Sequence, residues 1–426
     1  MNSDGVAFLT PPEVNTGPLS PELIAALDST VNALRTASNN DESVLEIGAA
    51  GDVRAAWLLT DLMRFTPGGD SGAVTTAFET LTGLPLREQF NWKTATDALI
   101  AWDIPEPPGY VDWKRVPFEL VDERWAPFFD DEDSLIDWRF YSWGGVLIDD
   151  RARDDVVSVC QRGCIPTIND PALTDAAGGD WYPDERTVFG VVVNDEAVAF
   201  PKNIMEVHEM VNTTIGGRRV GIPYCTLCGS AQAYFTDNVD GFDTLELRTS
   251  GLLARSNKVM FDLDNFSIFD TFTGQALSGP LLDAEVELEQ LSVITSTWAD
   301  WKEAHPDTSI VAEDGGISRT YSLDPLRGRD DNGPIFPVGD VDPRAGVQES
   351  VIGVIAEDGT PIAFPAEDVR EAIDNGQTPG LAGITIVAEA GGFQALAADG
   401  EPVATHEAFW FAWSQFHPDT LLWPSV

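Results

Sequence analysis

Hydrophobic residues near the start of the chain recur at the three-to-four spacing of amphipathic helices. Ser20 is a suitable N-cap for the first of these helices, and Pro21 suits its first helical position. The apolar stripe of this helix comprises Leu23, Leu27, Val31 and Leu34. The pattern predicts a helical domain over residues 20–104, after an extended segment over residues 1–19.

The segment from Gly51 to Ala56, followed by two leucines, is similar to the start of a HEAT-type helical repeat. We therefore expect a HEAT-like arrangement of helices in this domain. Prolines between positions 105 and 108 then interrupt the helical pattern, and short apolar stretches separated by turn residues follow. These features predict strands, turns and short helices after the prolines, with a linker and entry segment over residues 105–165 and a β-rich region beyond it.

The β-rich region contains an internal repeat. Residues 188–193 and 199–201 read Val-Phe-Gly-Val-Val-Val and Ala-Phe-Pro, and residues 351–356 and 363–365 read Val-Ile-Gly-Val-Ile-Ala and Ala-Phe-Pro. Each copy predicts a strand, a turn and a second strand, followed by a helix that begins at proline, and each ends in a His-Pro-Asp-Thr turn. The prediction is an α+β fold in which a β-rich unit is duplicated. Its parts are a first unit over 166–312, a connector over 313–344 and a second, degenerate unit over 345–426.

The net charge of -45 at pH 7 limits the choice of partners. A surface this acidic repels nucleic acids and anionic lipids, so we expect neither as a partner. No apolar run reaches the roughly 18 residues that a membrane-spanning helix requires, which predicts a chain with no transmembrane segment. The N-terminus lacks the basic and apolar regions of a signal peptide. Two locations stay open: the cytoplasm, or an extracytoplasmic site occupied by a mature form.

The strongest chemical signal is the pair Cys225 and Cys228 in the segment Tyr-Cys-Thr-Leu-Cys-Gly-Ser. A Cys-x-x-Cys-Gly turn directs both sulfur atoms to one side, which suits a metal ion or a reversible disulfide. The corresponding stretch of the second unit, residues 384–396, has neither cysteine nor histidine. Folding of such a unit therefore does not require the thiols, which favours a functional site in the first unit.

His208 precedes the cysteine turn, in a segment that we predict to be helical. On a helix, Met205, His208 and Asn212 share one face. The turn itself is predicted to connect strands 219–224 and 231–235 in the manner of a hairpin. If the helix packs across the end of this hairpin, His208 reaches both sulfur atoms.

Two thiolates, an imidazole and a thioether form a soft ligand set that suits copper, with zinc as the alternative. We therefore predict a metal-binding or redox protein of open physiological role. Its ligands are Cys225, Cys228, His208 and Met205, with Met260 as an alternative weak ligand. The sequence leaves the oligomeric state open.

Two other functions also stay open. In a thiol enzyme, Cys225 or Cys228 is the nucleophile, activated by His208 and by backbone N–H groups, while Glu209 orients the imidazole. Adjacent residues of a helix point apart, which makes Glu209 awkward in that role. In a binding module, the helical N-terminal region serves a protein partner, and the cysteines form only a disulfide.

Several further elements accompany the cysteine turn in a fixed order. They are Trp143–Val146, Cys164–Pro166, Ala199–Pro201, His208–Asn212, Tyr224–Ser230, Ser250–Leu253, Thr273–Gly274 and Phe409–Trp413. Together they resemble a bacterial and archaeal family known only as a domain of unknown function, over roughly residues 112–425. The resemblance implies no established activity. Members often follow an export signal or a lipoprotein leader, so the resemblance implies an extracytoplasmic mature form.

Relative to that family, this chain inserts residues 149–162. Cys160 and Cys164 are therefore local additions. Their three-residue spacer permits a disulfide within a turn. The alternative is that they join Cys225 and Cys228 in a four-cysteine zinc site.

Overall fold

The structure is a computed structural model, and it describes residues 10–65, 72–86, 91–329 and 332–424. The chain divides into two compact units. The first comprises Met1–Ile148, Leu252–Ser256 and Pro334–Val341, and the second comprises Asp149–Gly251, Asn257–Gly333 and Asp342–Val426. The first unit thus continues well past residue 104, the predicted end of the helical domain.

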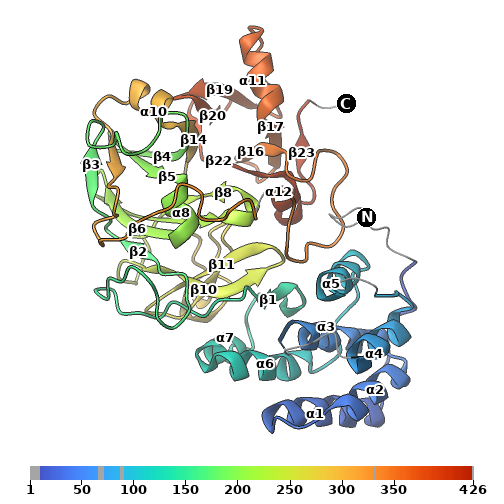
Figure 1. The fold of residues 1–426 in the computed structure, drawn as a ribbon. Coiled ribbons are helices and arrows are strands. Elements are labelled where there is room, and N and C mark those ends of the chain that lie inside the picture. Colours follow the sequence, from blue (N-terminus) through green and yellow to red (C-terminus); the bar gives the residue numbers. More distant parts are fainter. Residues whose placement is uncertain (1–9, 66–71, 87–90, 330–331, 425–426) are drawn as a thin grey trace. The chain divides into compact units, whose positions relative to one another are not determined.

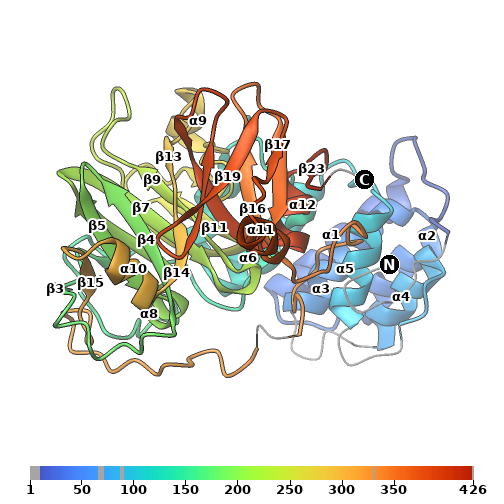
Figure 2. The same cartoon turned by 90° about the horizontal axis from the view of Figure 1, so that it is seen from above.

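Helices form most of the described part of the first unit (Figures 1 and 2). They are α1 (Pro21–Arg35), α2 (Asp41–Ala50), α3 (Ala56–Phe65), α4 (Gly72–Thr82), α5 (Asn91–Ala101), α6 (Tyr110–Val121) and α7 (Ala126–Asp130). The predicted cap of α1 is confirmed, because the backbone N–H of Leu23 donates to Ser20 Oγ at 3.1 Å. Leu23, Leu27 and Val31 of the predicted stripe are buried.

Two helices, α6 and α7, occupy part of the segment that we predicted as a linker. The prolines interrupt the helical pattern only locally, and a new apolar face begins at Tyr110 and continues with Trp113 and Val116, all of them buried. This three-residue spacing is itself a helical signal. The helical region is therefore longer than predicted, and its HEAT-like arrangement stays a prediction.

The β-rich region contains five sheets, which follow one another as the blades of a five-bladed propeller (Figure 1). Their strand orders are β1-β10-β11-β12, β13-β9-β7-β6-β2, β14-β4-β5-β15-β3, β22-β16-β17-β23 and β18-β19-β20-β21. With the helices of the first unit, this confirms a mixed α+β fold. Duplication of a whole β-rich unit stays a prediction.

The first three sheets use strands from the first three quarters of the chain. These are β1 (Tyr141–Trp143), β2 (Ile168–Asn169), β3 (Leu173–Asp175), β4 (Thr187–Val193), β5 (Glu196–Pro201), β6 (Met210–Ile215), β7 (Arg218–Cys225), β8 (Ser230–Ala231), β9 (Ala233–Phe235), β10 (Leu247–Ala254), β11 (Asn257–Asp262), β12 (Ile268–Phe269), β13 (Gln290–Leu291), β14 (Ile294–Thr297) and β15 (Ser309–Val311). The helices between them are α8 (Lys202–His208), α9 (Gly279–Asp283) and α10 (Trp298–Ala304).

The last two sheets come from the C-terminal part. Their strands are β16 (Ser350–Ile355), β17 (Pro361–Pro365), β18 (Gly380–Leu381), β19 (Ile384–Glu389), β20 (Gly392–Leu396), β21 (Pro402–Val403), β22 (Thr405–Phe409) and β23 (Leu421–Leu422). Helix α11 (Ala366–Asp374) follows β17, and helix α12 (Trp410–Phe416) follows β22.

Two of the sheets share a local packing motif. In each, a central antiparallel hairpin, β4-β5 or β16-β17, is flanked by an antiparallel strand on one side and a parallel strand on the other. Trp301 covers Gly190 of β4, and Trp413 covers Gly353 of β16. Each indole N–H donates to a threonine hydroxyl at 2.9 Å. The repeated sequence pattern thus corresponds to a repeated packing arrangement, in which an indole ring lies against a glycine of a strand.

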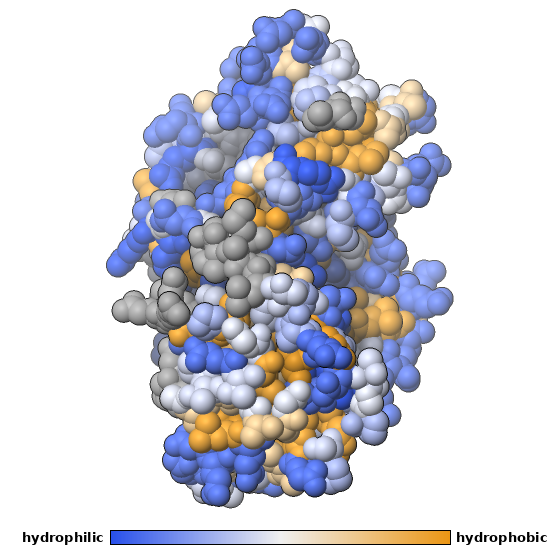
Figure 3. All heavy atoms as spheres, turned by 90° about the vertical axis from the view of Figure 1, so that its right-hand side faces the viewer, coloured by the Kyte–Doolittle hydropathy of each residue, from blue (hydrophilic) through white to orange (hydrophobic). Residues whose placement is uncertain are grey.

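In Figure 3, hydrophilic residues cover most of the face shown, and hydrophobic residues form smaller patches among them. Within the described residues, no helix has both the length and the apolar character needed to cross a membrane.

Replacement of Gly190 by Ala should destabilise the second unit. An ideal Cβ at this position lies 2.1 Å from the Trp301 ring, so the indole must move out of a packed core. We expect a loss of about 1–3 kcal/mol in the free energy of unfolding, measured by urea denaturation. Gly17→Ala is the control, because no atom lies within 4 Å of its Cβ position. Equal stabilities for the two variants would contradict this account.

Candidate functional site

The two cysteines of the Cys-x-x-Cys motif lie in a tight turn at the end of β7. Cys225 ends this strand, residues Thr226–Cys228 form one turn of 3-10 helix, and Ser230 pairs back with Cys225. Gly229, between Cys228 and Ser230, has a left-handed backbone with φ 59°. The predicted hairpin-type connection is therefore confirmed.

Both thiol groups are buried, with exposed fractions of 3% for Cys225 and 0% for Cys228. The two side chains are in hydrogen-bond contact with each other. Burial raises the pKa of the Cys228 thiol well above its usual value, and the contact with Cys225 and the negative charge of Glu209 raise it further. Cys228 is thus a protonated thiol near neutral pH.

Gly229 is required at its position for two reasons. Its left-handed backbone is one that side chains rarely adopt, and an ideal Cβ there lies 3.0 Å from the ring of Phe409. Phe409 ends β22 and belongs to the tryptophan-rich C-terminal element. The C-terminal part of the second unit therefore packs directly against the thiol turn.

Helix α8 ends at His208, which differs from our prediction of a longer helix. Glu209 adopts a left-handed backbone with φ 53° and caps the helix, and β6 begins at Met210. Asn212 is therefore a strand residue and does not share a helical face with His208. Its amide exchanges hydrogen bonds with the backbone of Leu247, at 2.9 and 3.2 Å, which is a structural role.

His208 is fully buried and both ring nitrogens have partners. Nδ1 lies 2.6 Å from the carbonyl oxygen of Pro166, and Nε2 lies 2.7 Å from the hydroxyl of Tyr321. A carbonyl oxygen can only accept, so Nδ1 carries the proton and Nε2 accepts from Tyr321. Burial lowers the pKa of His208 to about 4, which keeps the ring neutral. Metal binding through Nε2 would require loss of the bond to Tyr321.

Glu209 reaches the thiol turn with its side chain. Thr226 Oγ1 donates to Glu209 Oε1 at 3.3 Å, which holds the carboxyl group over the 3-10 turn. Burial raises the pKa of Glu209, and the positive charge of Lys258 and this hydrogen bond oppose that rise. Glu209 therefore contacts the turn and does not orient His208, the role considered for it in a thiol enzyme.

Lys258 is a member of this site that the sequence did not single out. Its side chain extends from β11, is 4% exposed, and donates from Nζ to the backbone carbonyl of Glu209. Burial lowers its pKa to about 8, while the nearby charges of Glu209, Cys225 and Asp149 raise it. Residues 209, 225 and 258 are far apart along the chain, and β11 meets the turn only through tertiary packing. The sequence therefore offered no signal for Lys258.

Cys160 and Cys164 form a disulfide, as the three-residue spacer allows. Sulfur atoms bonded to each other supply no thiolate ligands. This pair therefore does not complete a four-cysteine zinc site in this structure.

A family model described as a protein of unknown function (DUF3179) matches residues 162–400, more than half of the chain. The chain belongs to the DUF3179 family. No match was found among curated proteins or among solved structures.

Two members of the predicted copper ligand set have other contacts in the DUF3179 protein. Met205 packs in the hydrophobic core of the second unit, and His208 is held by Pro166 and Tyr321. Across the described residues, no three histidine, cysteine or acidic side chains gather as a metal site. Metal binding by this DUF3179 protein, with Cys225, Cys228, His208 and Met205 as ligands, stays a prediction.

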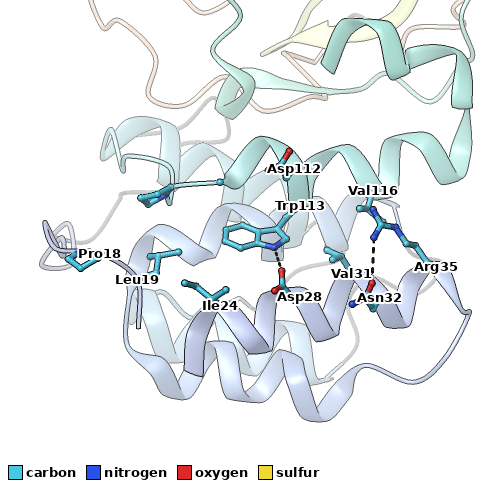
Figure 4. A pocket seen from close by; sticks show the side chains of 12 residues that line it. Pro18, Leu19, Ile24, Asp28, Val31, Asn32, Arg35, Asp112, Trp113 and Val116 are labelled. Atoms are coloured by element: carbon cyan, nitrogen blue, oxygen red, sulfur yellow. Dashed lines mark hydrogen bonds between the residues drawn. The ribbon is translucent and has the colours of Figure 1, made fainter. Parts of the chain in front are cut away.

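A separate cavity of about 520 Å³ lies between α1 and α6 in the first unit (Figure 4). Leu19, Ile24 and Val31 contribute apolar surface, and the indole N–H of Trp113 donates to Asp28 at 2.8 Å. The described residues that line this cavity of the DUF3179 protein include no cysteine or histidine. It therefore offers none of the thiol chemistry found in the second unit.

His208 should make the stability of this DUF3179 protein sensitive to acid. Its pKa is about 4 in the folded state against 6.5 in a model peptide, so between these values the unfolded chain binds more protons. The free energy of unfolding should fall as the pH falls through this window, by on the order of 3 kcal/mol from His208. Urea denaturation at both ends of the window measures this loss.

The matched variant is His208→Gln, which keeps a donor and an acceptor but does not titrate. His406 and His417 are also buried with lowered pKa values, of about 3 and 4, so part of the acid sensitivity should persist in the variant. An unchanged pH dependence after the substitution would show that His208 does not contribute.

Proposed function

We propose that Cys225 and Cys228 are a redox-active dithiol that exchanges with a disulfide of a partner protein. The observation that carries this proposal is the contact between two buried thiols in one tight turn, with an ammonium and a carboxyl group beside them. Structural cysteines of a core need neither charged group. Residues 384–396, the stretch that the predicted repeat aligns with the thiol segment, contain no cysteine.

The geometry of the turn favours closure of a disulfide. Cys225 and Cys228 are three positions apart across one turn of 3-10 helix, and their side chains already touch. A bond between the two sulfur atoms then needs rotation of the side chains and little movement of the backbone.

The reaction proposed is a two-step thiol–disulfide exchange. The Cys225 thiolate attacks one sulfur of the partner's disulfide, which forms a mixed disulfide and releases one partner thiolate. The Cys228 thiol then loses its proton and attacks Cys225 Sγ, which releases the second partner thiolate. The partner gains two electrons, and this chain gains the Cys225–Cys228 disulfide.

The Cys160–Cys164 disulfide supports an extracytoplasmic location in the same proposal, because structural disulfides persist mainly in oxidising compartments. Thiol exchange with secreted or surface proteins fits such a location. A disulfide-bearing protein is then the partner.

The dithiol can be tested by equilibration in glutathione buffers of graded redox potential, followed by alkylation and mass spectrometry. We expect reversible loss of two thiols at Cys225 and Cys228 with a single midpoint. Cys225→Ser and Cys228→Ser should each abolish it. The double change Cys160→Ser, Cys164→Ser is the control, which should keep the couple. Absence of a Cys225–Cys228 disulfide at every potential would refute the proposal.

Metal binding is the second candidate, supported by the same contact between two soft sulfur ligands. Protein purified after growth with copper and zinc should then carry about one equivalent of metal per chain. The double change Cys225→Ser, Cys228→Ser should remove this metal. Metal-free protein with a reversible Cys225–Cys228 disulfide would exclude metal binding and support only the dithiol function.

A further inference from the structure

The cavity between α1 and α6 has the size of a small-molecule binding site. Its volume of about 520 Å³ lies within the range of roughly 300–1,000 Å³ that ligand pockets occupy. Its lining residues come from positions 18–35 and 108–116, which all belong to the first unit. The thiol turn lies in the second unit, so an inference about this cavity is independent of the proposed dithiol function.

Part of the cavity wall is apolar and includes an aromatic ring. Four of its residues are at most 8% exposed, namely Leu19, Val31, Trp113 and Val116. Gly109 also lines the cavity, with a left-handed backbone, and a Cβ at this position would lie 3.7 Å from the six-membered ring of Trp113. A side chain there would cover part of the ring. The glycine therefore leaves the indole open to an apolar or aromatic ligand.

Two carboxylates of the cavity have no cationic partner among the described residues. Asp28 accepts a hydrogen bond from the indole N–H of Trp113 at 2.8 Å and forms no ion pair there (Figure 4). Asp112 has neither a hydrogen bond nor an ion pair within the described part of the chain. By contrast, Arg115 of the same helix pairs with Glu119. The negative charge of the cavity is therefore available to a ligand.

Arg35 is the one cation among the described residues that line the cavity, and it does not neutralise these carboxylates. Its guanidinium lies 3.5 Å from the side-chain oxygen of Asn32 (Figure 4). Arg35 follows Asp28 by seven residues of α1, which corresponds to about 10 Å along the helix axis. The cavity thus has an uncompensated negative charge beside the indole of Trp113.

We propose that this cavity binds a small organic cation, namely an amine carried on an aromatic or short aliphatic body. The ammonium group pairs with Asp28 and Asp112, and the body packs against Trp113 and the apolar residues of the wall. Because Asp28 is hydrogen-bonded to the indole, an ammonium at Asp28 also lies close to the ring. Cation–π attraction then adds to the ion pair.

The test measures binding of three matched probes to the full chain by isothermal titration calorimetry. Phenethylammonium, phenethyl alcohol and phenylacetate share one aromatic body and differ in charge. We expect the amine to bind about fivefold more tightly than the alcohol, because an exposed ion pair and a cation–π contact each contribute modestly. Phenylacetate should bind most weakly of the three.

Variants of the two aspartates show whether the preference arises in this cavity. Asp28→Asn keeps an acceptor for the Trp113 indole but removes the charge. Combined with Asp112→Asn, it should abolish the advantage of the amine and leave the affinity for the alcohol unchanged. Arg35→Gln removes a positive charge from the same cavity, so it should not weaken binding of the amine.

Glu46→Gln is the matched control for the acidic charge of the whole chain. It removes an exposed carboxylate of α2 that does not line the cavity, and it should leave all three affinities unchanged. Thermal melts show whether each variant folds, and the single aspartate variants keep the test decisive if the double variant does not. Equal affinities for the amine and the alcohol in the unmodified chain would overturn the proposal. An advantage of the amine that persists without both aspartate charges would overturn it as well.

Discussion

The backbone carbonyl of Glu209 accepts two hydrogen bonds, and the thiol site depends on them. One comes from the N–H of Tyr224 in β7 and the other from the ammonium of Lys258 in β11. Glu209 can present its carbonyl in this way because its left-handed backbone ends α8 and turns the chain into β6. Such a conformation is uncommon for a residue with a side chain, so the surrounding contacts must hold it. One residue thus joins the helix, the strand that carries Cys225 and the strand that carries Lys258.

Two other residues of the His208–Asn212 segment stabilise the arrangement around Glu209. His208 ties the end of α8 to Pro166 and Tyr321, and Asn212 ties β6 to the backbone of Leu247. These bonds are buried, where an unsatisfied partner would cost about 1–3 kcal/mol. His208 and Asn212 therefore hold the backbone around the thiol turn in place. Glu209 is the residue of this segment whose side chain contacts the turn.

Lys258 and Glu209 bring groups of opposite charge to the buried thiol turn. Cys225 lies beside a buried ammonium, and Cys228 lies in a fully buried position that faces a carboxyl group. The whole chain carries a net charge of -45, so the positive charge of Lys258 is opposite in sign to the net charge of the protein. Because Lys258 is buried, dissolved salt and surface carboxylates screen its charge only weakly.

Local signals in the sequence determined the elements and the position of the chemistry. The Ser20 cap, the hairpin-type turn at Cys225 and the Cys160–Cys164 disulfide depend on residues close in the chain, and the structure contains each of them. The apolar stripe that begins at Tyr110 was also readable, but the preceding prolines concealed it.

Tertiary structure alone decided which side chains surround the thiols. The sequence pattern placed Met205, His208 and Asn212 on one helical face, but α8 ends at His208 and Asn212 lies in β6. One left-handed residue redirects the chain there, and propensity does not reveal it because glutamate rarely adopts that conformation. Lys258 arrives from β11, more than thirty positions after Cys225 along the chain, and Phe409 arrives from the C-terminal sheet. Spacing in a sequence reports neighbours within one element, whereas the packing of separate sheets brings these groups together.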